Sequence, residues 1–267
     1  MLNKHSKMNL KSFLPPISIA EFVSSILIIE SFDFREQFNL PLYANGCPTI
    51  IFQTSNAVKG HKTIGNLTLY GQTVLPDELI FNSSFVFIAY FLYPHSLNSL
   101  FKIKASELTD DFLPLTDIKQ AKAINLNEQL LNEQTLDGRL NLINQFILQL
   151  ARESTADNSK TIFVTNELIN TEGASLPNIQ RKLNTSERTL ERLFDNNVGV
   201  SPNMFRRICQ FHKAFQQLNS YNFTKLTDVT YENGFADQSH FSRVFKEFTG
   251  LTPSEYLIKR APYNPKF

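Results

Sequence analysis

Residues 186–205 and 237–256 carry one pattern of residues, repeated at a constant spacing of 51 positions. The matched pairs are Leu190 with Phe241, Arg192 with Arg243, Phe194 with Phe245, Gly199 with Gly250, and Pro202 with Pro253. Apolar residues four positions apart indicate a helix, and a Ser-Pro or Thr-Pro pair suits the start of the next one. Upstream, residues 176–179 match 226–229 at a spacing of 50. The repeat therefore predicts a helix–tight turn–helix unit that occurs twice.

The second helix of each predicted unit, at 186–196 and 237–248, has a polar outer face. With Leu190 and Phe241 facing the core, the opposite face is found at roughly 100° per residue. It carries Arg188, Glu191, Arg192 and Asp195 in the first helix, and Ser239, Ser242, Arg243 and Lys246 in the second. Gln238 and His240 flank that face near the start of the second helix. Arg, Gln, Ser and Glu side chains can all bond to base edges in the major groove. A polar face is also the default for any soluble helix, but an arginine at the same outward angle in both copies favours DNA binding.

Two long stretches resemble the DNA-binding domain of AraC/XylS-type transcription regulators. They are SLPNIQRKLNTSERTLERLFDNNVGVSPNMFRRICQFHKAF and GFADQSHFSRVFKEFTGLTPSEY, within a similarity that covers about residues 160–262. The resemblance implies seven helices, with two helix-turn-helix units joined by a long helix at about 201–219. It further implies that two recognition helices enter successive major grooves on one face of DNA. By motif position, the base-contacting residues are Arg188, Glu191 and Arg192, then Gln238, Ser239, His240 and Arg243.

The sequence departs from the family pattern at several positions. Gln180 and Thr230 stand where family members usually have alanine, and Gln210 occupies a place that is often basic in the long helix. Residues 195–197 (Asp-Asn-Asn) replace a commonly basic tract. Because phosphate contacts depend on basic side chains, we expect weaker phosphate attraction, above all in the first unit.

The N-terminal half predicts a small antiparallel sheet or barrel followed by helices. Apolar, β-branched runs indicate strands at 24–30, 48–53, 67–70 and within 79–93, whereas residues 1–20 are expected to be a loose arm. Short helical segments are expected at 96–101, 105–108 and 118–132. The fold class is thus α+β with two domains, the first β-rich and the second an all-α domain of seven helices.

Leu136–Arg152 is the clearest predicted helix of this half, because apolar residues recur at steps of four and three. Such a stripe is typical of a core face, and a homodimer contact through 136–152 is the alternative. The polar stretch after it predicts a linker at 153–160, between a regulatory domain at 1–152 and a DNA-binding domain at 161–267. LPLYANGCPTIIFQ and FLYPHSLNSLFKIKASELTDDFLPL are similar to the regulatory domain of one AraC-like subgroup. That resemblance implies signal sensing, by a small-molecule effector, or dimerisation.

Composition limits the other function classes. The 267 residues carry a net charge of +1, divided as −2 over residues 1–156 and +3 over 157–267, which is weak evidence for DNA on its own. Neither the two cysteines nor the five histidines show metal-ligand spacing, so we expect no cofactor, no metal and no enzyme activity. No apolar run is long enough to cross a bilayer, so we expect a cytoplasmic protein without a signal peptide.

The preferred hypothesis is a bacterial, sequence-specific DNA-binding transcription regulator. Family analogy further suggests that it is an activator and that it contacts RNA polymerase. A small-molecule-binding protein with a weakened DNA domain is the alternative. A DNA-repair enzyme rests on the analogy of domain fusions alone.

Overall fold

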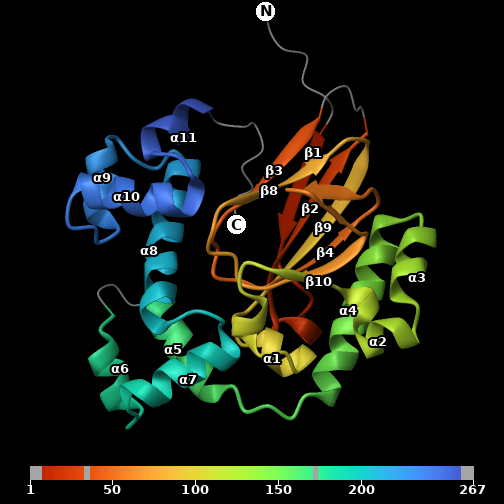
Figure 1. Ribbon diagram of the computed structural model, residues 1–267, viewed down its shortest axis with the longest axis horizontal. Helices are drawn as coiled ribbons and strands as arrows, with labels where there is room; N and C mark the ends of the chain where they lie inside the picture. Colours follow the sequence, from red (N-terminus) through yellow and green to blue (C-terminus); the bar gives the residue numbers. More distant parts are fainter. Residues whose placement is uncertain (1–7, 33–36, 171–173, 260–267) are drawn as a thin grey trace, which may run out of the picture.

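The computed structural model describes residues 8–32, 37–170 and 174–259. Its N-terminal part, residues 8–153, contains two antiparallel sheets (Figure 1). The six-stranded sheet has the order β1 (Met8–Phe13), β2 (Val23–Ser31), β9 (Phe85–Leu92), β4 (Thr49–Gln53), β7 (Leu67–Tyr70) and β10 (Phe112–Pro114). The four-stranded sheet has the order β3 (Phe38–Leu42), β8 (Asp77–Phe81), β5 (Ala57–Lys59) and β6 (Lys62–Ile64).

The centre of strand β2, residues 26–29, is apolar without interruption. Alternate side chains of a strand point to opposite faces of the sheet. Ile26 and Ile28 pack in the core on the helical side, while Leu27 and Ile29 pack in the core shared with the second sheet. Because both faces are covered, the strand is buried throughout its centre, and the predicted small sheet is realised as two stacked sheets.

Helices cover the outer face of the six-stranded sheet (Figure 1). Those of the N-terminal part are η1 (Ile17–Ile19), α1 (Ser96–Phe101), η2 (Ala105–Leu108), η3 (Leu115–Asp117), α2 (Lys119–Ala123), α3 (Leu126–Asn132) and α4 (Leu136–Glu153). The apolar stripe of α4 lies in the core, where Ile143 and Ile147 are fully buried. This stripe therefore serves the fold of the protomer, and a homodimer through 136–152 would have to use the polar side of α4.

The C-terminal part, residues 159–259, contains seven helices among its described residues, as predicted. They are α5 (Ser159–Asn170), α6 (Leu176–Lys182), α7 (Glu187–Asn197), α8 (Pro202–Asn219), α9 (Leu226–Glu232), α10 (Gln238–Thr249) and α11 (Pro253–Lys259). Helix α8 runs between an α5–α7 group and an α9–α11 group (Figure 1). The repeat thus corresponds to two helix-turn-helix units on either side of one long helix.

Two expectations for the N-terminal part were wrong or incomplete. Residues 8–13 are not part of a loose arm: β1 pairs antiparallel with β2 over its full length, from Met8↔Ser31 to Phe13↔Ile26. Residues 1–7 of that predicted arm lie outside the described residues. The sequence patterns also did not predict strands β3, β5, β6 and β10, three of which have only three residues.

None of the helices that the structure describes could cross a membrane. Within the same residues, no three His, Cys, Asp or Glu side chains are grouped closely enough to hold a metal ion. His95 instead packs between Phe22 and Tyr93, and burial lowers the pKa of its imidazole to about 4.

Candidate DNA-binding surface

Helices α7 and α10 begin in the same way in the two copies of the repeat. The Ser186 hydroxyl accepts a hydrogen bond from the Thr189 N–H at 3.3 Å, and the Asp237 carboxylate accepts one from the His240 N–H at 2.7 Å. Such caps satisfy backbone donors in the first turn. The tight turns before the caps also match, because Asn184 and Gly234 both have positive φ, at 47° and 72°. Helices α7 and α10 are therefore each held at a fixed angle to the helix before them.

The outer face of α10 is largely open. Gln238, Ser239, Arg243 and Lys246 are exposed, whereas His240 and Ser242 are half-buried. The His240 ring lies edge-on to Phe235 with the ring centroids 5.5 Å apart, and its Nδ1 accepts from the Ala236 N–H at 3.5 Å. His240 thus helps to hold the turn as well as bordering the surface.

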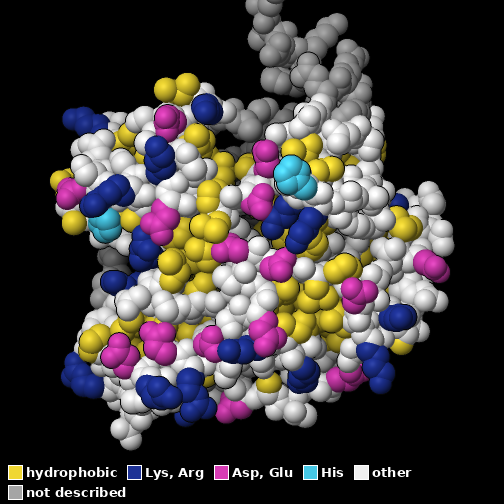
Figure 2. Space-filling model, viewed as in Figure 1, with side chains coloured by type: hydrophobic (Ala, Val, Ile, Leu, Met, Phe, Trp, Pro, Cys, Tyr) yellow, Lys and Arg dark blue, Asp and Glu magenta, His cyan; other side chains and the backbone are white. Residues whose placement is uncertain are grey.

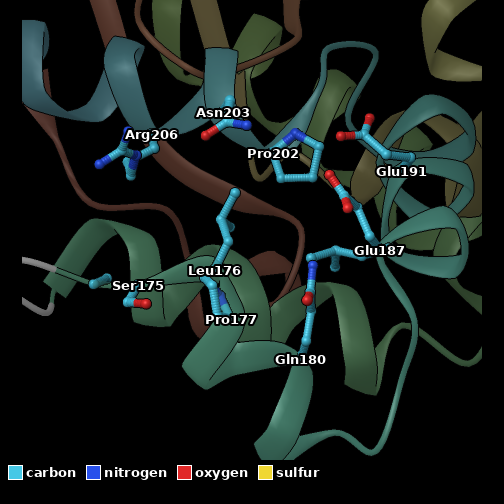
Figure 3. Close-up of a pocket in the computed structure, with 11 residues that line it drawn as sticks. Ser175, Leu176, Pro177, Gln180, Glu187, Glu191, Pro202, Asn203 and Arg206 are labelled. Atoms are coloured by element: carbon cyan, nitrogen blue, oxygen red, sulfur yellow. The ribbon is translucent and has the colours of Figure 1, made fainter.

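The outer face of α7 is open only in its first half. Arg188 and Arg192 are exposed, but Glu191 is half-buried and lines a hollow between α6, α7 and α8 (Figure 3). Asp195, expected on the outer face, instead forms an ion pair with Lys104 of the N-terminal part, with Nζ and Oδ2 2.6 Å apart. Hydrogen bonds from Lys104 and Ser106 lower the pKa of the Asp195 carboxyl. Asp195 therefore belongs to an interface within the chain.

That interface continues into the first repeat's glycine turn. Gly199 has φ +91°, and its carbonyl accepts a hydrogen bond from the Thr109 hydroxyl at 2.7 Å. A Cβ at Gly199 would lie only 2.7 Å from the same hydroxyl oxygen and 2.9 Å from the Ala105 carbonyl oxygen. Only glycine satisfies both the backbone conformation and this close approach.

The N-terminal part also contacts the second unit. The ring of Tyr43, just after β3, meets the rings of Phe215 and Tyr256 edge-on, with centroid distances of 5.6 and 6.4 Å. Its neighbour Ala44 is only 1% exposed and belongs to the hydrophobic core of α8–α11. The N-terminal part therefore contacts both helix-turn-helix units.

The departures from the family pattern have local explanations. Thr230 is buried, and its hydroxyl donates to the Leu226 carbonyl at 2.8 Å, so its polar group is satisfied. The Gln210 amide donates to the Asn233 carbonyl at 3.0 Å and so ties α8 to the end of α9. Gln180 lines the hollow of Figure 3.

Two basic residues of the surface were missed by sequence reasoning. Arg206 and Lys213 are both exposed on α8. Arg206 lines the hollow of Figure 3, of about 410 Å³, and also a second hollow of about 320 Å³ that it shares with Lys213 and His240. Their spacing of seven residues on one face of a helix was the available signal.

Comparison with known proteins agrees with this geometry. A family model described as a helix-turn-helix domain matches residues 179–259. An uncharacterized HTH-type transcriptional regulator of Staphylococcus aureus strain COL is 32% identical over 85 residues, 32% of this chain and 11% of that protein. The HTH-type transcriptional activator RhaR of Escherichia coli O1:K1 / APEC is 35% identical over 71 residues, 27% of this chain and 25% of RhaR. Residues 179–259 therefore form an AraC-type helix-turn-helix domain.

Other matches concern the rest of the chain. A second family model, a domain of unknown function (DUF6597), matches residues 11–114. The chain spans about a tenth of the length of the Staphylococcus aureus relatives it matches. Among solved structures, ToxT from Vibrio cholerae aligns over 84% of this chain and 97% of its own, with a TM-score of 0.46 and 14% identity.

Proposed function

We propose that this AraC/XylS-type protein is a sequence-specific DNA-binding transcription regulator, and that α7 and α10 enter two successive major grooves. The observation that carries the proposal is the pair of equivalent, capped helices that expose Arg192 and Arg243 at equivalent positions. An exposed arginine on such a helix can bond in bidentate fashion to guanine. Two helices fixed to one central helix can make such contacts on one face of the duplex.

The two helices do not contribute equally in this proposal. Helix α10 offers exposed Gln238, Ser239 and Arg243 beside Lys246, so most base contacts are assigned to it. Helix α7 offers Arg188 and Arg192, but the carboxylates of Glu187 and Glu191 lie next to them. Glu191 can accept a bond from a cytosine amino group, yet carboxylates also repel phosphates.

We assign activation, through contact with RNA polymerase in the cytoplasm, on family grounds; RhaR is itself named an activator. We also propose that the N-terminal part controls DNA binding, with the division near residues 153–160. A small cavity of about 40 Å³ lies between the two sheets, and among the described residues the buried Tyr70 hydroxyl beside it has no hydrogen-bond partner. Leu40–Asn45 line this cavity and carry Tyr43 into the contact with Phe215. A small, mainly apolar effector that opens the cavity would therefore move a segment that touches the second unit.

Gly199→Ala tests this coupling, and Gly250→Ala is its matched control. Both glycines have positive φ, so either alanine should cost about 1–2 kcal/mol of stability from backbone strain. Only at Gly199 does the new Cβ collide with the N-terminal part, because the nearest atom at Gly250 is 4.0 Å away. We expect Gly199→Ala to cost about 1–3 kcal/mol more in urea denaturation and to change DNA affinity beyond its control. Equal effects of the two variants would contradict the proposed coupling.

The DNA proposal is tested by selection from a pool of random duplexes with the full-length chain. Recognition helices in successive major grooves should enrich sites with two conserved blocks whose centres are about 10 base pairs apart. A single block would restrict sequence readout to one unit. No enrichment over repeated rounds would contradict the proposed function.

A further inference from the structure

Helix α8 carries a polar stripe on the side opposite its buried face. Its members are Asn203, Arg206, Gln210, Lys213 and Gln217. They recur at steps of three or four, so they lie in one row along the helix. The buried face of the same helix carries Phe205, Ile208, Phe211 and Phe215. Arg206 and Lys213 are two turns apart in this row, which is roughly 10 Å along the axis.

This stripe forms the floor of the second hollow, which both helix-turn-helix units border. Leu168 and Ala174 come from the first unit, and Glu232–Gly234 and His240 come from the second. Figure 2 shows Lys and Arg side chains, interspersed with Asp and Glu, along this side of the molecule, from α10 past α8 to α6 and α7. The hollow therefore lies between the two surfaces that carry the recognition helices.

Charge distinguishes the two hollows. The first has one cation, Arg206, at the opposite end of the hollow from the carboxylates of Glu187 and Glu191 (Figure 3). The second has Arg206, Arg207 and Lys213 with one carboxylate, Glu232. An anion is therefore favoured in the second hollow.

Arg206 and Lys213 are the cations available for that anion. The Arg207 guanidinium is held by Glu247, at 2.6 Å from Oε2, and lies over the ring of Phe248. The Glu232 carboxylate accepts from the Gln217 amide at 2.5 Å. Among the residues that the structure describes, Arg206 and Lys213 have no ion-pair partner.

The dimensions of α8 fit the DNA between two major grooves. Its 18 residues extend roughly 27 Å, while successive major grooves on one face are about 34 Å apart. With α7 and α10 in those grooves, α8 lies over the intervening minor groove and its phosphates. Resting on the proposed function, the geometry points to a DNA-backbone site on α8, in which Arg206 and Lys213 each bind a phosphate between the two base-contacted segments. These contacts carry no sequence information, but they fix the register of both units on the duplex.

Salt dependence tests this site without knowledge of the operator. Binding of wild type, Arg206→Gln, Lys213→Gln and the double variant is measured by fluorescence anisotropy. The duplex has random sequence and about 30 base pairs, and salt runs from about 50 to 200 mM. The plot of log K against log salt has a negative slope, and each lost phosphate contact should make it shallower by about 0.9. The double variant should make it shallower by about 1.8. At about 0.1 M salt each single variant should bind roughly eightfold more weakly.

Lys122→Gln, an exposed lysine of α2, is the matched control for the loss of one charge and should leave the slope unchanged. Glu232→Gln, which removes the carboxylate from the hollow, should tighten binding. The backbone site is overturned if the Arg206 and Lys213 variants keep the slope of the Lys122 control. It is also overturned if they weaken binding to a selected site but not to the random duplex. If wild type binds neither duplex, the proposed function falls as well, so the two failures are distinguishable.

Discussion

Replacing Phe245 with alanine should lower the free energy of unfolding of the C-terminal part by about 3–5 kcal/mol. Phe245 lies on the inner face of α10 and is fully buried. Its ring centroid is 5.3 to 5.7 Å from those of Phe211, Phe241 and Tyr256, and 6.2 Å from that of Phe215. Truncation removes these contacts and leaves a cavity beneath the helix assigned most of the base contacts. Urea denaturation followed by circular dichroism measures the loss.

The same substitution at the equivalent position of the repeat provides the comparison. Phe194 is also fully buried, but its ring meets chiefly that of Phe205, edge-on and at a centroid distance of 5.9 Å. We expect Phe194→Ala to cost less than Phe245→Ala, and Phe245→Leu to cost under about 1.5 kcal/mol. A loss below about 1 kcal/mol for Phe245→Ala would show that α10 is not anchored as described.

Arg243→Ala should remove about 1–3 kcal/mol of discrimination at one base pair of the selected site. The guanidinium is exposed on the outer face of α10, where no described carboxylate holds it. Its loss should therefore relax base preference at that position while stability stays nearly unchanged. Competition between the selected duplex and versions substituted at single base pairs measures the effect.

Arg192→Ala is the paired variant in the first unit, and it should cost less discrimination. Its neighbours Glu187 and Glu191 make the α7 surface less attractive to DNA, and Asp195 lies in the contact with Lys104. A larger loss for Arg192→Ala than for Arg243→Ala would reverse the assignment of the main base-contacting helix. Equal losses across all tested sequences would mean that both arginines bind phosphates.

The C-terminal part could be predicted well because its signals are local. Two kinds of signal mark where the helices begin: the caps Ser186 and Asp237, and the prolines Pro202 and Pro253. Each lies within one turn of the helix start that it determines. Because these signals recur at a constant spacing, the sequence predicted two equivalent helix-turn-helix units. The predicted limits of the recognition helices agree with the observed ones to within one residue.

The N-terminal part was harder because its strands depend on partners distant in sequence. Strand β10 has only three residues, too few for a periodic pattern, and it is defined by pairing with β7. The contact between Lys104 and Asp195 joins residues that are 91 positions apart, so no local sequence pattern predicts it. For the same reason the helical wheel placed Asp195 in solvent.

The proposed phosphate-binding stripe of α8 was overlooked for a different reason. The departures from the family pattern, Gln210 among them, suggested weaker phosphate attraction, above all in the first unit. The structure shows Gln210 occupied with the Asn233 carbonyl, while Arg206 and Lys213 flank it on the same face. A cation one turn away on the helix can bind the same DNA backbone. A comparison with the family pattern at single positions does not reveal this.

A hydroxyl-radical footprint of the full-length protein on its selected duplex tests the central claim most directly. Two recognition helices on one face should protect two segments about 10 base pairs apart on the same side of the duplex. Arg243→Ala should weaken protection of the segment contacted by α10 more than protection of the segment contacted by α7. Protection of a single segment, or no specific protection at any salt concentration, would contradict the assignment of α7 and α10 to successive major grooves.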